Sequence, residues 1–275
     1  MKQAGIRSAI TRSALCALSL MSLAAPARAE DSRFTIEPTQ DYKIFGSVGL
    51  VREMDESDPE HGSGFMISPC HVLTNYHVAF GSDSAQPVKD KRVRFSLGVA
   101  GKSGTETFAG TVVGFGDDFL PTRNRYDDWA LIRLDSSPGE KYGWFNIAAT
   151  PFPAVRQLEL VSAGFPADKP ASTLWGDSCR IPDRENYGWI TNCILVPGSS
   201  GGPIATRTQR GEYVVVGMNS GFHVNRGLVS KSEVRRDKLN IATPISGLYD
   251  RVQALMKNNS CSPKPPMTAS VGGAG

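Results

Sequence analysis

A glycine-rich segment, Val-Pro-Gly-Ser-Ser-Gly-Gly-Pro, carries two adjacent serines, Ser199 and Ser200. Serine attacks a carbonyl carbon only when a neighbouring base takes its proton, and acyl transfer also needs hydrogen-bond donors for the oxygen that becomes negative. Glycines let successive backbone N–H groups converge on such an oxygen. The segment is therefore compatible with a nucleophile loop or with an ordinary tight turn, and a base elsewhere in the chain decides between them.

The chain has four histidines that could supply this base: His61, His71, His77 and His223. His77 lies in the stretch Thr-Asn-Tyr-His-Val-Ala, where a strand-like run ends and the chain turns. Loops at strand ends carry functional residues more often than strand interiors do. His77 is therefore the candidate base, although a lone histidine in such a place is more often structural or solvated.

Two adjacent aspartates, Asp127 and Asp128, head an alternating run, Trp-Ala-Leu-Ile-Arg-Leu. Because side chains alternate across a strand, Asp128 shares a buried face with Ala130 and Ile132, while Asp127 points away. A buried carboxylate needs a partner, and an imidazole N–H is a natural one. We interpret Asp128 as the residue that orients His77. The simpler alternative is that both aspartates cap a turn.

The elements that position these residues are mostly strands. Short runs rich in Val, Ile, Phe and Leu, separated by Gly, Pro, Asp and Asn, predict strands along most of the chain. These runs start at Lys43, Gly62, Arg92, Gly110, Asp128, Leu158, Gly188 and Tyr213. Many short strands with turn signals between them favour an antiparallel sandwich or barrel.

One helix is predicted near the end of the chain. Between Ile245 and Met256 the apolar residues recur at helical spacing, with Ser246 as a plausible cap. The following residues, 261–275, are rich in Pro, Gly and Ser and predict a flexible tail.

Residues 1–29 have the features of a secretory signal peptide. A basic start with Lys2, Arg7 and Arg12 precedes an apolar run and an Ala-Arg-Ala sequence, which predicts cleavage after Ala29. The apolar run is too short to span a bilayer, so we expect a secreted or periplasmic protein with no membrane association after cleavage. The segment holds four of the 30 basic residues and no acid, which leaves 26 basic against 27 acidic residues. That balance gives no indication of a nucleic-acid partner.

Four cysteines remain after this cleavage: Cys70, Cys179, Cys193 and Cys261. An even number in an exported protein indicates disulfides, with three possible pairings. We favour Cys179–Cys193, which closes a short loop before the serine segment, together with Cys70–Cys261. Reduced thiols or a metal site are the alternatives. The chain has no C-x-x-C or His-rich spacing, so we expect neither a metal nor another cofactor.

Three of these stretches together resemble the trypsin/chymotrypsin-like serine peptidases, and particularly the bacterial branch with the glutamyl-endopeptidase-like enzymes. Leu-Thr-Asn-Tyr-His-Val-Ala resembles the family's Thr-Ala-Ala-His motif, and Asp-Asp-Trp-Ala-Leu-Ile-Arg-Leu resembles its Asp-Ile-Ala-Leu-Leu motif. Gly-Ser-Ser-Gly-Gly-Pro resembles Gly-Asp-Ser-Gly-Gly-Pro. The chain order His, Asp, Ser is the order of that family, and unrelated triad folds use other orders. The resemblance extends from about Lys43 to Met256 and implies His77 as base, Asp128 as orienting acid and Ser200 as nucleophile.

The resemblance also implies an all-β fold of two packed antiparallel six-stranded β-barrels with a C-terminal α-helix. In this chain the N-terminal barrel, with the histidine and the aspartate, would occupy residues 43–150. The C-terminal barrel and the helix, with the serine, would occupy residues 151–260. Residues 30–42 would form an N-terminal strap or a short propeptide.

Further roles follow from the same resemblance. The backbone amides of Gly198 and Ser200 would form the oxyanion hole. Ser220 would be the serine that touches the buried aspartate, and the edge from Ser220 to Phe222 would pair with the substrate backbone by strand addition. The residues implied in substrate binding are Ile194, Leu195, Val196, Asn219, Ser220, Gly221 and Phe222.

One departure from the family pattern concerns activation. Digestive members carry an aspartate immediately before the nucleophile, and it pairs with a new N-terminus after zymogen cleavage. Here that position is Ser199, which cannot form an ion pair, and no Ile-Val-Gly-Gly sequence occurs near Glu30. We expect an active site that does not depend on that salt bridge.

A second departure concerns specificity. The residues implied for the primary pocket, 194–196, include no acid, so a bound Arg or Lys side chain would lack a partner there. Glutamyl-specific enzymes tend to place a histidine in the substrate-binding strand. Here Asn219 occupies the usual place and His223 comes a few residues late. The sequence therefore favours apolar or small substrate side chains over basic or acidic ones.

The sequence thus predicts a secreted, monomeric serine endopeptidase that hydrolyses polypeptides through an acyl-enzyme intermediate. The alternative from another class is a catalytically silent protease homologue acting as a binding or adhesion protein. An esterase is disfavoured because its Ser-Asp-His order is absent. A quality-control protease with a peptide-binding second domain is disfavoured because few residues follow Met256.

Overall fold

The computed structural model divides the chain into two units, residues 1–30 and residues 31–275, and only the second is described below. The described residues are 31–37, 39, 42–54, 61–81, 90–98, 104–116, 124–186, 188–222 and 240–261. The predicted signal peptide, the tail after Cys261 and His223 therefore lie outside the described residues.

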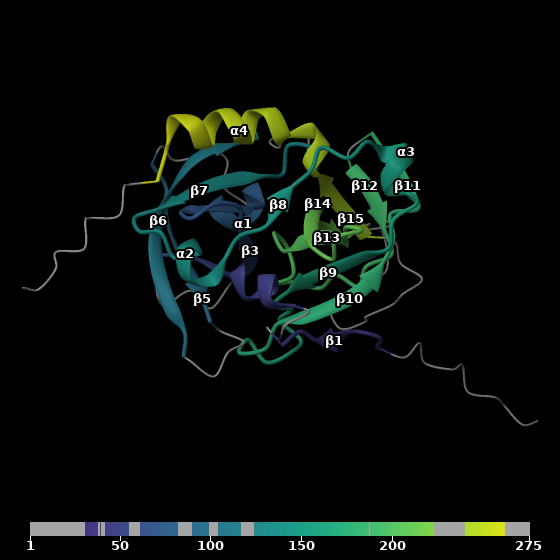
Figure 1. Ribbon diagram of the computed structural model, residues 1–275, viewed down its shortest axis with the longest axis horizontal. Coiled ribbons are helices and arrows are strands. Elements are labelled where there is room, and N and C mark those ends of the chain that lie inside the picture. Colours follow the sequence, from purple (N-terminus) through teal and green to yellow (C-terminus); the bar gives the residue numbers. More distant parts are fainter. Residues whose placement is uncertain are drawn as a thin grey trace, which may run out of the picture. The chain divides into compact units, whose positions relative to one another are not determined.

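A closed β-barrel forms the first half of this unit (Figure 1). Its six antiparallel strands follow the order β2 (Val48–Glu53), β3 (Gly62–Met66), β4 (His71–Thr74), β7 (Ala130–Leu134), β6 (Glu106–Phe115) and β5 (Arg92–Leu97). Each strand contributes at least one apolar side chain to a common interior, among them Val51, Met66, Val72, Val112, Val93 and Ile132. The apolar runs of the sequence are short because each strand crosses this interior once.

The second half is a sheet of nine strands in place of the predicted six-stranded barrel. Its order is β1 (Phe34–Thr35), β10 (Trp175–Cys179), β9 (Leu160–Gly164), β13 (Pro203–Arg207), β14 (Tyr213–Phe222), β15 (Asn240–Pro244), β12 (Gly188–Thr191) and β11 (Asp183–Glu185), and β8 (Asn146–Ile147) pairs with β14. Six of these strands have four residues or more. The other three, β1, β8 and β11, have two or three residues each and raise the number of strands from the predicted six to nine. The predicted all-β class, with a closed six-stranded barrel and a C-terminal helix, is confirmed.

An apolar core also lies where the barrel packs against the second sheet. Strand β7 serves both cores, because Ala130 and Ile132 pack inside the barrel whereas Trp129 and Leu131 pack toward the second sheet. This alternation is the one expected from the sequence. Asp128 lies two residues before this doubly buried strand, and its side chain is itself fully buried.

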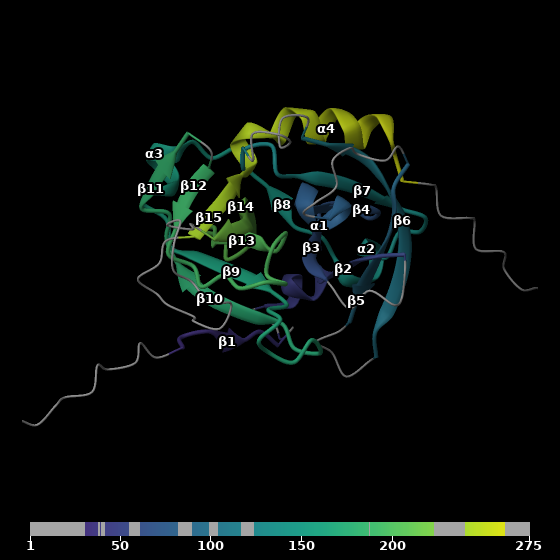
Figure 2. The ribbon, with the colours of Figure 1, turned by 180° about the vertical axis from the view of Figure 1, so that it is seen from behind.

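The C-terminal helix α4 (Tyr249–Asn258) lies along one side of both sheets, as Figure 1 and Figure 2 show from opposite directions. Val252, one of its residues, is fully buried. The helix starts later than predicted, because residues Ile245–Gly247 form a 3-10 turn, η2, and Ser246 lies inside that turn. Leu248 is the N-cap residue and makes no side-chain capping bond, so the assignment of Ser246 as the cap is wrong.

The first predicted strand begins with a helical turn. Residues Lys43–Ser47 form a 3-10 helix, η1, and strand β2 starts only at Val48. The turn buries the ring of Phe45, which packs edge-on against Phe145 and Tyr213. Burial of this aromatic ring, together with the i→i+3 bonds of the turn, overrides the strand-like composition of the segment.

The segment 31–37 lies along the second sheet, where β1 pairs with β10. Arg33 is almost fully buried there, and its guanidinium binds both Asp31 and Asp168. Ser32 donates to the buried Asp177. These bonds attach the first described residues to the sheet that also carries the serine loop.

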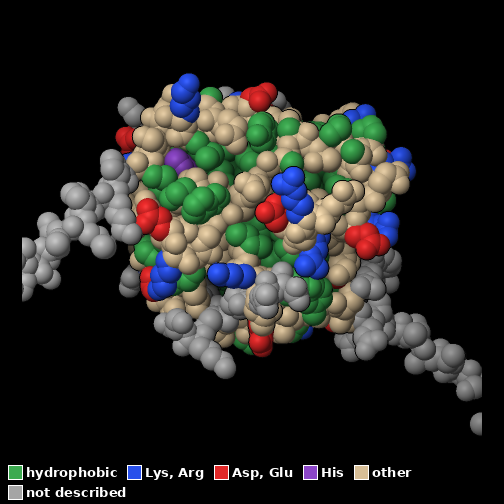
Figure 3. Space-filling model, viewed as in Figure 1, with side chains coloured by type: hydrophobic (Ala, Val, Ile, Leu, Met, Phe, Trp, Pro, Cys, Tyr) green, Lys and Arg blue, Asp and Glu red, His purple; other side chains and the backbone are tan. Residues whose placement is uncertain are grey.

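Two disulfides hold further parts of this unit together: Cys70–Cys261 and Cys179–Cys193. Both match the pairing favoured from the sequence. The first joins the barrel to the end of α4, and the second connects β10 to the segment after β12. On the face shown in Figure 3, basic and acidic side chains lie scattered among hydrophobic and neutral ones.

Candidate active site

His77 lies in the first turn of the short helix α1 (Tyr76–Phe80), which begins directly after β4. The ring of Tyr76 stacks on that of Phe80 inside the barrel core and fixes the helix there. Asn75, at the N-cap position, donates through Nδ2 to the backbone carbonyl of Asp128 at 2.8 Å. This bond connects the start of the helix to Asp128 independently of the contacts that His77 makes.

The imidazole of His77 binds the buried carboxylate of Asp128. Nδ1 lies 2.9 Å from Oδ2 and 3.0 Å from Oδ1, and the His77 backbone N–H donates to Oδ1 at 3.2 Å. Since an ionised carboxylate can only accept, Nδ1 carries a proton in this pair. In a neutral imidazole the other ring nitrogen, Nε2, is then the basic one.

Two further side chains donate to the same carboxylate. Arg125 Nη1 lies 2.8 Å from Oδ2, and Ser220 Oγ lies 2.5 Å from it. Burial raises the pKa of Asp128, but His77, Arg125 and Ser220 outweigh burial and lower this pKa to about 2. The carboxylate is therefore ionised at neutral pH, with donors from both halves of the molecule.

The serine segment is a tight loop whose backbone requires glycine. Gly198 and Gly201 have φ of +89° and +82°, in the left-handed region that side chains rarely adopt. A side-chain carbon at Gly201 would lie 2.1 Å from the carbonyl oxygen of Ser63. Both glycines therefore set the loop's shape, as the sequence pattern indicates.

Ser200 is partly exposed at the end of this loop. Its hydroxyl donates to the carbonyl oxygen of Ser220 at 3.3 Å, so its hydrogen bond is directed there rather than to His77. Hydrogen bonds between catalytic groups are often absent or long without substrate. Ser220 thus contacts the serine through its carbonyl and the aspartate through its hydroxyl.

The barrel holds the loop through Ser63 of β3. The Ser63 N–H donates to the carbonyl of Ser200 at 2.7 Å, and the Ser63 hydroxyl donates to the carbonyl of Gly198 at 2.7 Å. The same hydroxyl accepts the N–H of Phe165 at 2.9 Å. Ser63 was not among the residues singled out from the sequence.

Two amides of the loop are candidates for an oxyanion hole. The N–H of Ser199 donates to Val196 and that of Gly201 to Asn219. Those of Gly198 and Ser200, by contrast, have no hydrogen-bond partner among the described residues. Their N–H groups therefore have no competing bond within that part of the chain.

The residues predicted to line the substrate site form two segments, one before Ser200 in the sequence and one after it. Ile194, Leu195 and Val196 are 6% to 8% exposed, and the Ile194 amide donates to Asp177. The Asn219 side chain points inward and bonds to Ser162 and Ala163. Gly221 and Phe222 lie at the end of β14, where their backbones pair with β15.

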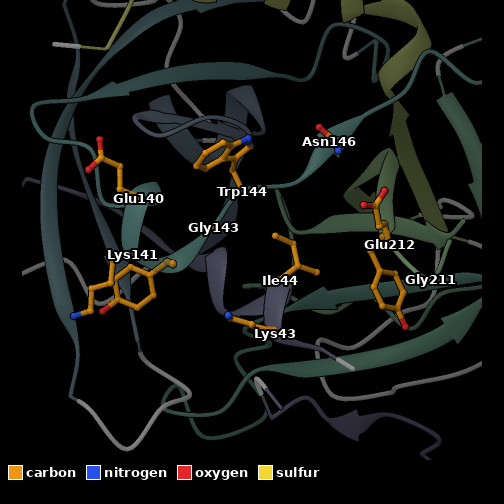
Figure 4. A pocket seen from close by; sticks show the side chains of 11 residues that line it. Lys43, Ile44, Glu140, Lys141, Gly143, Trp144, Asn146, Gly211 and Glu212 are labelled. Carbon is orange, nitrogen blue, oxygen red and sulfur yellow. The ribbon is translucent and has the colours of Figure 1, made fainter. Parts of the chain in front are cut away.

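A separate pocket of about 480 Å³ contains none of these residues (Figure 4). It lies between η1, the segment from α2 (Gly139–Tyr142) to β8, and the turn between β13 and β14. Trp144 beside it is 42% exposed. Among the described residues, its lining includes no histidine, serine or cysteine.

Within the described residues, one His/Cys/Asp/Glu cluster has the spacing of a metal site: Cys70, His71 and Cys261. The two cysteines are joined in a disulfide, which removes both thiolates as ligands. The expectation of no metal cofactor stays a prediction.

Comparison with solved structures shows the same fold at low identity. A Glu endopeptidase in complex with MPD matches with a TM-score of 0.60 and 16% identity, covering 82% of this chain and 98% of that one. A serine endoprotease from Yersinia pestis matches with a TM-score of 0.53 and 16% identity, covering 82% and 69% of the two chains.

Among curated proteins, one from Bacillus subtilis (strain 168) named extracellular metalloprotease is 24% identical over 179 residues. The match covers 63% of this chain and 55% of that protein, so the chain spans about half the length of this relative.

A family model described as the trypsin-like peptidase domain matches residues 62–218, more than half of the chain. The matched range contains His77, Asp128 and Ser200. The chain belongs to the trypsin-like peptidase domain family, the trypsin/chymotrypsin-like serine peptidases.

Proposed function

We propose that this protein is a secreted serine endopeptidase that uses His77, Asp128 and Ser200 as a catalytic triad. The observation that carries the proposal is the 2.9 Å contact of His77 Nδ1 with the buried Asp128 carboxylate. It fixes the tautomer whose Nε2 can accept a proton from a serine.

In the first step Ser200 Oγ attacks the carbonyl carbon of the scissile peptide bond, and its proton passes to His77 Nε2. The C–O bond that forms gives a tetrahedral intermediate with a negative oxygen. His77 then gives the proton to the leaving nitrogen as the C–N bond breaks, which leaves an ester on Ser200. Water then gives a proton to His77 and attacks the ester carbonyl carbon, and the bond from this carbon to Ser200 Oγ breaks as His77 returns the proton to Oγ, which releases the acid product.

The amides of Gly198 and Ser200 would stabilise the negative oxygen. Their proposed role is supported by the positive φ of Gly198 and by the lack of another described partner for either N–H. Removal of one such donor typically costs a factor of 10² to 10³ in kcat.

Substrate would bind as an added strand along Ser220–Phe222. Apolar or small side chains are favoured at the primary position, because Ile194, Leu195 and Val196 carry no charge. The buried Asp177, which contacts this segment, already accepts the Ile194 amide and the Ser32 hydroxyl. A basic substrate side chain would therefore lack a charged partner at these residues.

Export is supported by two observations beyond the predicted signal peptide. Disulfides persist in oxidising compartments, and this chain has two. The relative from Bacillus subtilis is named as extracellular. None of the described helices is both long and apolar enough to cross a membrane.

Turnover of an internally quenched peptide library tests this function. Ser200→Ala and His77→Ala are expected to lower kcat by at least three orders of magnitude with little change in thermal stability. Ser199→Ala is the matched control, because it removes the adjacent hydroxyl of the same loop. Unchanged turnover of the Ser200→Ala protein would refute the assignment, and strong cleavage after Arg or Lys would refute the specificity.

A further inference from the structure

Arg125 lies three residues before Asp128, in the segment that leads into β7. Its Nη1 donates to Asp128 Oδ2 at 2.8 Å and lies 3.5 Å from His77 Nδ1. The Arg125 side chain is 22% exposed, whereas that of Asp128 is fully buried. The positive charge of Arg125 therefore lies beside the imidazole, and both groups contact the same carboxylate oxygen, Oδ2 of Asp128.

The second sheet is shaped to receive this side chain. A side-chain carbon at Gly221 would lie 3.3 Å from Arg125 Nη2, and one at Gly188 would lie 3.1 Å from Arg125 Cβ. The neighbouring Tyr126 also donates to the carbonyl of Glu185 at 3.2 Å. Two strands of the second sheet thus leave room for Arg125 at glycine positions, where a larger residue would crowd its side chain.

We propose that Arg125 is a positioning residue of the His77–Asp128 pair, and that its fixed charge favours the neutral imidazole that acts as the base. The inference rests on the proposed function and concerns the same site. Arg125 and Ser220 both donate to Oδ2 of Asp128, and His77 donates to both carboxylate oxygens, so three residues hold the carboxylate in its orientation. The guanidinium also disfavours a second positive charge on the ring beside it.

Few other charges of the described elements surround the pair. Asp127, next to Asp128, points away and pairs with Arg251 of α4. Helix α1 and strands β12, β14 and β15 carry no charged residue besides His77 itself. Strand β11, which packs on Tyr126, carries Asp183, Arg184 and Glu185, of which the first two are exposed and Glu185 is partly buried. Arg125 contacts both members of the pair.

The test is the pH profile of kcat/KM for a neutral peptide, measured for the wild type, Arg125→Met and Arg125→Lys. Methionine keeps much of the stem and removes the charge, and lysine restores the charge. The acid limb is expected to move to higher pH by roughly 0.5 to 1 pH unit in Arg125→Met and to return toward the wild-type position in Arg125→Lys. Arg251→Met is the matched control, because it removes the neighbouring arginine–aspartate pair, and its acid limb is expected to stay in place.

An unchanged acid limb in Arg125→Met would overturn this inference, as would an equal shift in the Met and Lys variants. A change confined to KM would overturn it as well, since that result assigns Arg125 to substrate binding. The thermal midpoint of each variant is measured in parallel, and Arg125→Gln replaces the methionine variant if that protein does not fold. Turnover that survives Ser200→Ala would overturn the proposed function together with this inference, whereas Ser200-dependent turnover with an unmoved acid limb overturns this inference alone.

Discussion

The hydroxyl of Ser220 donates a hydrogen bond of 2.5 Å to Oδ2 of Asp128 and thereby joins the second sheet to the barrel at the centre of the site. Ser220 belongs to β14, and Asp128 lies two residues before β7. The Ser220 carbonyl also accepts the hydroxyl of Ser200. One residue of β14 therefore contacts both the orienting acid and the proposed nucleophile.

Ser220→Ala removes the hydroxyl bond and keeps the carbonyl contact. Hydrogen bonds to charged groups contribute about 1.5–3 kcal/mol, and His77 and Arg125 still bind the carboxylate in this variant. We expect kcat/KM to fall roughly tenfold while KM changes little. Steady-state kinetics of Ser220→Ala beside Thr206→Ala, which removes a hydroxyl from the neighbouring strand β13, checks this. Equal activity of the two variants would contradict a role for the Ser220 hydroxyl.

Acid stability is expected to depend on the N-terminal segment. The hydrogen bond from Arg33 is the main cause that holds the pKa of Asp31 well below its ordinary value. A carboxylate whose pKa is lower in the folded state stabilises the fold above its unfolded pKa of about 4, and this contribution disappears as the pH falls below that value. Urea unfolding from pH 7 to pH 2.5 should therefore show a loss of stability below pH 4 that is smaller in Asp31→Asn.

The same cluster predicts that loss of the Arg33 charge lowers the free energy of unfolding at neutral pH. Arg33→Met removes the guanidinium from Asp31 and Asp168, but Lys169 still pairs with Asp31 and both carboxylates are about one third exposed, which reduces the penalty. We expect a loss of about 1–3 kcal/mol in the free energy of unfolding. Glu159→Gln, which breaks the exposed pair with Arg180, is the control and should change stability by less than about 0.5 kcal/mol. A loss no larger for Arg33→Met than for this control would contradict the prediction.

His71 is expected to make stability depend on pH in a second range, separate from that of Asp31. It is buried, lies 2.7 Å from Ser68 Oγ and 2.9 Å from the carbonyl of Asn259, and burial is the main cause that lowers its pKa below 6.5. Because the unfolded chain then binds a proton that the folded protein does not, stability is fully present above about pH 6.5 and falls as the pH drops below it. Thermal midpoints between pH 8 and pH 5 should decline in the wild type and stay flatter in His71→Gln. Parallel curves would exclude His71 as the source.

The Cys70–Cys261 disulfide is expected to hold the C-terminal helix to the barrel. It joins residues 191 positions apart, and removal of a native disulfide typically costs about 2–5 kcal/mol. The Cys70→Ser/Cys261→Ser double variant should lose stability in this range, and limited proteolysis should cut first near α4. The Cys179→Ser/Cys193→Ser variant is the comparison, because its loop spans only 14 positions. Initial cleavage at the same place in both variants would contradict this role.

Local pattern sufficed for much of the site. The alternation along β7 and the glycine-dependent loop at Ser200 follow from residue types at fixed spacing, and the pairing of His77 with Asp128 follows from the family resemblance. Ser63 was missed because its contacts join segments distant in the sequence. Arg125 was missed although it lies only three residues before Asp128, because no sequence pattern indicates that its side chain turns toward the buried carboxylate. Short elements were missed for a related reason, since a two-residue strand such as β8, or the 3-10 turn that buries Phe45, forms only when its tertiary partner is present.

The most direct test of the central claim is a fluorophosphonate probe whose site of attachment is mapped by mass spectrometry of the purified protein. With the proposed triad we expect one adduct, on Ser200. It should be lost in Ser200→Ala, strongly reduced in His77→Ala and retained in Ser199→Ala. An adduct on Ser199, or labelling of Ser200 that does not depend on His77, would contradict the proposed triad.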